Sequence, residues 1–476
     1  MPRTTNRWLI LVLVCVAQFM VVLDATIVNV ALPSIQTGLH FSQLNLQWIV
    51  NIYTLFFGGF LLLGGRASDL LGRQRLFLAG LALFTLASLV NGVATSGGML
   101  IAGRAVQGLG AALVSPAALS IVTTTFAEGK ERTRALGIWS AIAAGGGAVG
   151  LLLGGLLTDT LSWRWVFFIN LPIGIAAFVL GLRYIHNTRA AQRPESADVV
   201  GAVTVTAGLL ALVYDIVKAQ QYGWTSGRTL GLFVVAIALL ATFVVTELRS
   251  KAPLIRLSIF RTRSLTSANV AMLFVMSGLM SMFYFASIYV QEVLGWSPLK
   301  AGAAFLPVTA GIVVGAGLAQ GLVRALGVRV VPVIGIAMAA AGLVLLSGIP
   351  THGTYLANLL PGLAVMSVGM GLTFVPITLI ATTGLADEDA GLASGLFNTA
   401  QQVGGALGLA VLSSIAASRT HRVHEATHAA SLVDGFQLAF LTGAGLMAAA
   451  IVVIVVTLRG HHVAAVATGE AAMVPA

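Results

Sequence analysis

About fourteen apolar runs, each of roughly 18–25 residues, follow one another along this chain of 476 residues. A run of that length is long enough to cross a bilayer as a helix. Because the bilayer core offers no water to the backbone, only helices or a closed barrel can cross it, and these runs lack the alternation of barrel strands. The chain is therefore predicted to be an all-α, polytopic membrane protein. The runs begin near Trp8, Leu46, Leu76, Leu100, Ala135, Val166, Val199, Leu230, Thr266, Ala301, Val330, Leu356, Gly391 and Phe436.

The composition and the distribution of charge agree with a membrane location. Hydrophobic residues make up 58% of the chain and charged residues 9%, which is too little charge for the surface of a soluble protein of this size. Most of the 26 Lys and Arg residues fall in alternate loops, as the positive-inside rule requires. The net charge of +10 is thus explained without a nucleic-acid partner, and both termini are predicted to lie on the cytoplasmic side of the cell membrane.

The chain contains an internal repeat, which indicates two similar halves. The predicted halves are 8–185 and 266–458, with two inserted helices at 199–247 and a cytoplasmic tail at 459–476. Parallel six-helix halves around a central site are typical of one large class of secondary transporter. The repeat rests on Gly137, Gly146 and Gly150 followed by Leu151, and on Gly395, Gly404 and Gly408 followed by Leu409, at the same spacing.

Several segments together resemble the major facilitator superfamily, and within it the fourteen-helix drug:proton antiporters. The resemblance implies a major facilitator fold with two six-helix halves plus two inserted helices. It also implies proton-coupled export of small amphipathic compounds, such as drugs or antibiotics, by alternating access. In one departure, the family's antiporter segment has Gly-Pro where this chain has Gly150-Leu151. The segments are 23–33, 65–75, 104–110, the glycines from Gly137 to Gly155, 162–165 and 170–172.

Asp24 lies inside the first apolar run. A charged side chain at the centre of a membrane helix costs about 2.5–3.5 kcal/mol, so a retained acid there indicates a function. Burial disfavours the charged form of a carboxyl group, and Asp24 is therefore predicted to take up and release the transported proton.

Arg104 lies within the fourth run and cannot lose its proton, so it must be paired or hydrated. Gln107, Ala111 and Ser115 follow at helical spacing and give this helix a face that is predicted to line the cavity. The resemblance implies that Arg104 and Asp24 couple transport to protons. The alternative is a structural arginine that binds backbone carbonyls and holds two helices together.

Two further motifs take their predicted roles from the resemblance. The loop with Asp69 is expected to act as a gate, with a plain turn as the alternative. The glycines of the fifth run permit close helix packing, which could be either a sliding contact or a static one. The gating-loop residues are Gly65, Asp69, Gly72, Arg73 and Arg75, and the antiporter-motif residues are Gly137, Gly146, Gly150, Gly154 and Gly155.

The remaining predictions concern ligands. The partners are a small-molecule substrate, protons and the lipid bilayer, and the protein is expected to be a monomer without a cofactor or a bound metal. Asp215 and Glu292 are expected to reach water near helix ends. His421, His424 and His428 are interpreted as a hydrated loop rather than a metal site. Predicted substrate-binding residues are Asn29, Asn51, Tyr53, Gln107, Ser115, Asn398 and Gln401.

Two other functions stay open on the sequence. One is proton-coupled uptake of a small solute by symport, which the helix count and the glycines of the fifth run disfavour. The other is a membrane-embedded sensor or enzyme without transport. An enzyme should bring several ionisable residues to one depth, whereas the apolar runs offer chiefly Asp24 and Arg104.

Overall fold

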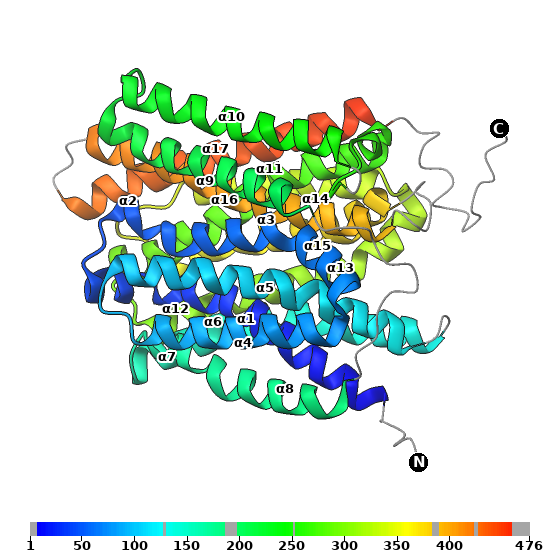
Figure 1. Ribbon diagram of the computed structural model, residues 1–476. Helices are drawn as coiled ribbons and strands as arrows, with labels where there is room; N and C mark the ends of the chain where they lie inside the picture. Colours follow the sequence, from blue (N-terminus) through cyan, green and yellow to red (C-terminus); the bar gives the residue numbers. More distant parts are fainter. Residues whose placement is uncertain are drawn as a thin grey trace, which may run out of the picture. The chain divides into compact units, whose positions relative to one another are not determined.

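The computed structural model describes residues 7–126, 130–185, 198–250, 253–382, 390–422 and 427–458, and these are helical with no strand among them. Figure 1 shows the helices in sequence colours. Their bounds are α1 (Arg7–Leu39), α2 (Gln43–Leu46), α3 (Trp48–Leu71), α4 (Arg73–Gly92), α5 (Gly97–Thr125), α6 (Lys130–Thr160), α7 (Trp165–Phe168), α8 (Asn170–Tyr184), α9 (Val199–Tyr222), α10 (Gly227–Arg249), η1 (Leu257–Arg261), α11 (Arg263–Ile288), η2 (Tyr289–Val293), α12 (Pro298–Ala304), α13 (Leu306–Leu326), α14 (Val330–Leu346), η3 (Tyr355–Leu359), α15 (Leu360–Thr382), α16 (Ala390–Arg422) and α17 (His428–Thr457).

The predicted all-α class is confirmed, and each apolar run coincides with a helix or with a pair of consecutive helices. Within the described residues, twelve segments are long and apolar enough to cross a membrane. Helix α14 is apolar but has only 17 residues, and α6, with 31 residues, is not among the twelve. The structure therefore supports twelve of the fourteen predicted spans by length and hydropathy.

By their contacts, the residues fall into two compact units. Unit 1 comprises residues 1–215, 222–254 and 296–305, and unit 2 comprises 216–221, 255–295 and 306–476. Within unit 1, α1 packs on α6, α5 and α8, and α5 packs on α3 and α4 (Figure 1). Within unit 2, α11 packs on α16 and α17, and α15 packs on α13 and α14.

The repeat predicted from the glycines recurs in backbone geometry at one turn of each unit. Gly72 ends α3 with φ 101°, and Gly327 follows α13 with φ 89°. Only glycine adopts such values without steric cost, which is why each turn contains one. Both turns join two successive helices tightly.

The repeat recurs again where a glycine face meets a neighbouring helix. A Cβ added at Gly146 of α6 would lie 3.2 Å from Val22 of α1, and one at Gly404 of α16 would lie 2.5 Å from the Leu273 carbonyl of α11. One turn further along, Gly150 faces Thr26 and Gly408 faces Ser277. The two units therefore use one packing scheme, in which a glycine face of one helix fits against the first helix of the unit.

Candidate functional site

The ion pair between Asp24 and Arg104 is the centre of the candidate site. The Arg104 Nη1 donates to Asp24 Oδ2, and the two residues are 1% and 0% exposed. Asp24 comes from α1 and Arg104 from α5, two helices that pack together in unit 1. A buried pair of this kind is costly to desolvate, and removing either partner leaves an uncompensated charge.

Two amide side chains, themselves held by a serine, complete the coordination of Asp24. Its Oδ1 accepts from Gln107 Nε2 at 2.7 Å and from Asn170 Nδ2 at 2.9 Å. Both amides also donate to Ser88 Oγ, each at 2.9 Å. Asp24, Gln107, Asn170 and Ser88 are all fully buried, at 0% exposure. The carboxylate is thus held by amide donors on α5 and α8 as well as by the guanidinium, and Ser88 of α4 holds both amides in place.

Arg104 also binds the backbone of α3. Its Nε donates to the Ile49 carbonyl at 3.2 Å, and its Nη1 donates to Gln107 Oε1 at 2.8 Å. The guanidinium lies 4.1 Å from the centroid of the Tyr53 ring, a cation–π contact. Arg104 therefore pairs with Asp24 and also links helices through a backbone carbonyl. Its contacts fit both predictions made from the sequence, a partner of the acid and a structural arginine.

The side-chain oxygen of Asn170 is an unused acceptor next to Asp24. Asn170 Oδ1 is buried and accepts no hydrogen bond. A neutral Asp24 would carry an O–H that needs an acceptor, whereas Arg104 offers only donors. Rotation of the Asn170 amide would bring its oxygen toward Asp24 and supply that acceptor. The network can therefore satisfy both the charged and the neutral state of the carboxyl group.

Asn170→Ala is expected to lower the free energy of unfolding by about 1–3 kcal/mol, because it removes a hydrogen bond to a buried charged group. The measurement is the thermal unfolding midpoint of the purified protein in detergent. Asn398→Ala is the matched control, since the exposed Asn398 amide donates only to the Ser394 carbonyl of its own helix, at 3.0 Å. Equal midpoints for the two variants would contradict the role given to Asn170.

The predicted gating-loop residues lie around the turn from α3 to α4. Arg73 Nη2 at the start of α4 lies 3.8 Å from Asp69 Oδ1 near the end of α3, and Gly72 supplies the turn between the two helices. Arg75 is exposed, and Gly65 faces Pro116 of α5. The structure therefore brings the acid and one arginine together.

Three of the predicted antiporter-motif glycines face α1 directly. At Gly150 an added Cβ would overlap Thr26 Oγ1 and lie 3.0 Å from the Leu23 carbonyl. At Gly154 it would lie 2.6 Å from the Ile27 carbonyl. Gly155 faces Pro298 of α12 instead, and Gly137 has nothing within 4 Å. The glycine face thus meets α1 directly beside Asp24.

The predicted substrate-binding residues are described within each unit separately. Gln107 and Tyr53 belong to the ion-pair network. Asn29 donates to carbonyls of its own helix, and Ser115 donates to Gln18 Oε1 at 3.0 Å. Asn51 is fully buried and donates to Gln47 Oε1 at 3.3 Å, while Asn398 and Gln401 lie on α16 of unit 2.

The expectation for Asp215 is wrong, because its side chain is only 3% exposed. Closeness to a helix end gives the position along the axis but not the side of the helix, and Asp215 lies on a covered side of α9. Glu292 is exposed, as expected. The part of the chain that the structure describes contains no cluster of metal ligands, and His424 lies outside it, as do the side chains of His421 and His428.

Sequence reasoning missed Ser88, Asn91 and the contact that Asn170 makes. Asn91 Nδ2 donates to Gln107 Oε1 at 2.7 Å, so it buttresses the amide that binds Asp24. Ser88 and Asn91 are three positions apart within an otherwise apolar run, which puts them on one face of α4. That spacing of polar residues was the signal available in the sequence.

A bundle of membrane-length apolar helices with a buried ion pair between α1 and α5 is the architecture expected of a membrane transporter. Residues 14–409 match the model of the Major Facilitator Superfamily. The chain belongs to this superfamily, and it is a transporter and not an enzyme.

Among its relatives, a cephamycin export protein of Amycolatopsis lactamdurans is 42% identical over 88% of this chain and 87% of its own. A puromycin resistance protein of Streptomyces alboniger is 38% identical over 99% and 95%. In structure, the chain is similar to the POT family transporter PepTSo, with a TM-score of 0.70, 16% identity and coverage of 96% and 98%. That likeness concerns the fold.

Proposed function

We propose that this protein exports small amphipathic compounds, antibiotics among them, from the cytoplasm in exchange for protons. The observation that carries the proposal is the ion pair of Asp24 and Arg104, fully buried and completed by Gln107 and Asn170. A titratable acid held this way within a membrane helix is costly unless it has a task.

The proposed cycle follows from the chemistry of the pair. Protonation of Asp24 from the outer side removes its charge and releases Arg104 from the ion pair. The rearranged site then turns inward, the proton leaves, and the carboxylate pairs with Arg104 again while substrate is captured. Gly146, Gly150 and Gly154 allow α1, which carries Asp24, to move against α6.

The substrate class draws on the relatives. Proteins that resemble this chain along most of their length bear the names of a cephamycin exporter and of puromycin and lincomycin resistance proteins. Export of an antibiotic or a similar amphipathic compound is therefore favoured over uptake of a nutrient. The protein is proposed to act as a monomer in the cytoplasmic membrane, with both termini in the cytoplasm.

The test uses energised inverted vesicles that contain the protein and a trapped pH dye. Adding a compound that the protein exports is expected to make the acidic lumen more alkaline. Protons leave the lumen as the compound enters it, so the dye reports coupling directly. Vesicles without the protein are the control. A further acidification on adding the compound would indicate symport, and no pH change with any compound that accumulates would contradict proton coupling.

A further inference from the structure

Helices α1 and α6 separate toward their N-terminal ends. At Gly154 and Gly150 an added Cβ would lie 2.6 Å and 3.0 Å from carbonyl oxygens of α1. At Gly146 the nearest atom is a side-chain carbon of Val22 at 3.2 Å, and still nearer the N-terminal ends a cavity lies between Ile138 and Ile142 of α6 and the residues of α1. The two helices therefore form a wedge whose closed end is beside Asp24.

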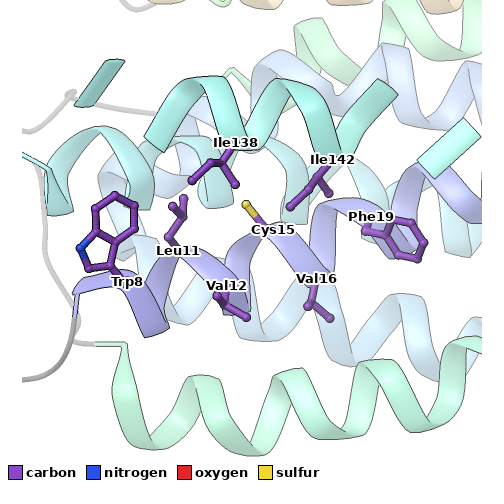
Figure 2. Close-up of a pocket in the computed structure, with 8 residues that line it drawn as sticks. All are labelled: Trp8, Leu11, Val12, Cys15, Val16, Phe19, Ile138 and Ile142. Carbon is purple, nitrogen blue, oxygen red and sulfur yellow. The ribbon is translucent and has the colours of Figure 1, made fainter. Parts of the chain in front are cut away.

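A cavity of 260 Å³ occupies the open part of this wedge (Figure 2). Trp8 lies at one end and Phe19 at the other, and the Cys15 sulfur points toward α6 between Ile138 and Ile142. Val12 is 56% exposed, so the cavity is open on one side. Its lining consists of Trp8, Leu11, Val12, Cys15, Val16, Phe19, Ile138 and Ile142.

The size and lining of this α1/α6 crevice define what fits it. Cavities that hold a whole drug-sized ligand measure about 300–1,000 Å³. A crevice of 260 Å³ lined by apolar residues is suited to the apolar part of such a molecule, for example a fused aromatic ring system. The polar remainder of the ligand must then lie outside.

Within the described part of the chain, the charges at the Trp8 end of the crevice are mainly positive. The Arg134 guanidinium lies 5.2 Å from the centroid of the Trp8 ring. Among the described residues there, Glu131 pairs with Arg7 at 3.7 Å, and the Arg132 guanidinium donates to the carbonyls of Thr123 and Phe126, whose ring packs on Trp8. A polar group that emerges at this end therefore meets an excess of positive charge, which favours anionic and neutral groups over cations.

We propose that the α1/α6 crevice binds the apolar ring system of the exported compound, with a neutral or anionic polar end beside Arg134. This inference rests on the proposed export function. It adds that the apolar part of the substrate binds in the crevice after the substrate enters from the inner side. Phe19 lies at the end of the crevice, five positions before Asp24. A ring bound there would hold α1 and α6 apart next to the point where they meet beside Asp24.

Protection of an introduced thiol from N-ethylmaleimide tests the proposal, because Cys15 is the only cysteine in the chain. Val12→Cys in a Cys15→Ala background places the thiol in the crevice. The probes are dansylamide, dansylglycine and dansylcadaverine, which share one ring system and are neutral, anionic and cationic. Saturating dansylglycine or dansylamide is expected to slow labelling at least tenfold, and dansylcadaverine to need at least a threefold higher concentration.

Two matched variants separate the crevice from general membrane effects. Val235→Cys in the same background lies on α10 and is 50% exposed, against 56% for Val12, and its labelling is expected to be unchanged by all three probes. Arg134→Gln is expected to weaken protection by dansylglycine about threefold and to leave protection by dansylamide unchanged.

Three results would overturn the proposal. They are the absence of protection by any probe, strongest protection by dansylcadaverine, and protection only by added phosphatidylglycerol, which would make the crevice a lipid site. Labelling is measured in detergent without a proton gradient. Protection without proton-coupled transport would therefore contradict the proposed function alone, and transport without protection would contradict the crevice alone.

Discussion

Asp24→Asn is expected to reduce concentrative transport at least a hundredfold while leaving substrate binding intact. An amide has the shape of a carboxyl group and can occupy the same network, but it cannot exchange a proton. Transport is measured as accumulation of a compound in energised inverted vesicles, and binding as ligand-induced thermal stabilisation of the purified variant. Pumping near the wild-type rate would exclude Asp24 as the proton carrier.

The fold of this variant needs its own control, because Arg104 is then buried without a counter-charge. Breaking a buried ion pair costs about 3–5 kcal/mol. The double variant Asp24→Asn/Arg104→Gln removes both charges and is expected to regain thermal stability, but not pumping. Stability and pumping recovered together in the double variant would show that the pair is structural.

Gly150→Ala is expected to reduce turnover at least tenfold. The added Cβ would overlap Thr26 Oγ1 and lie 3.0 Å from the Leu23 carbonyl, directly beside Asp24. Helix α6 would then have to move away from α1 along the contact that Gly146, Gly150 and Gly154 provide. Turnover is measured in proteoliposomes at saturating substrate, together with the thermal midpoint.

The matched control is Gly145→Ala on the same helix, where an added Cβ meets nothing within 4 Å and wild-type turnover is expected. Thr26→Ala in the Gly150→Ala protein removes the side-chain atom that the new Cβ overlaps. It is expected to restore part of the turnover. Full activity of Gly150→Ala alone would mean that α1 and α6 need not approach at this position.

The fold could be predicted from the sequence because the bilayer leaves few choices. An apolar run of adequate length must be a helix, and each predicted run coincides with one or two helices. The packing of Gly150 on α1 could also be anticipated, since small residues every four positions bring backbones together. Glycine spacing revealed the repeat, which Gly72 and Gly327 display again in their φ angles.

The site could be predicted only in part. Asp24 and Arg104 stood out because charges are rare within apolar runs, but no spacing along the chain shows that residues on two helices meet. Ser88 and Asn91 were missed because neutral polar side chains also serve membrane helices as ordinary hydrogen-bonding groups between neighbours, so they do not by themselves indicate a site. The burial of Asp215 and the α1/α6 crevice depend on which side of a helix is covered, and that is a property of packing alone.

The cancellation of charge between Asp24 and Arg104 has an electrical consequence. While the carboxylate is paired, the site as a whole is neutral. A voltage across the membrane therefore does no work on the site when the site changes from facing one side of the membrane to facing the other. Once a proton neutralises Asp24, the charge of Arg104 is no longer cancelled. Moving one such charge through a full 100 mV changes the free energy by about 2.3 kcal/mol. In the proposed cycle, a negative cell interior therefore accelerates the inward, proton-loaded half, and the return half is electrically silent when the exported compound is neutral.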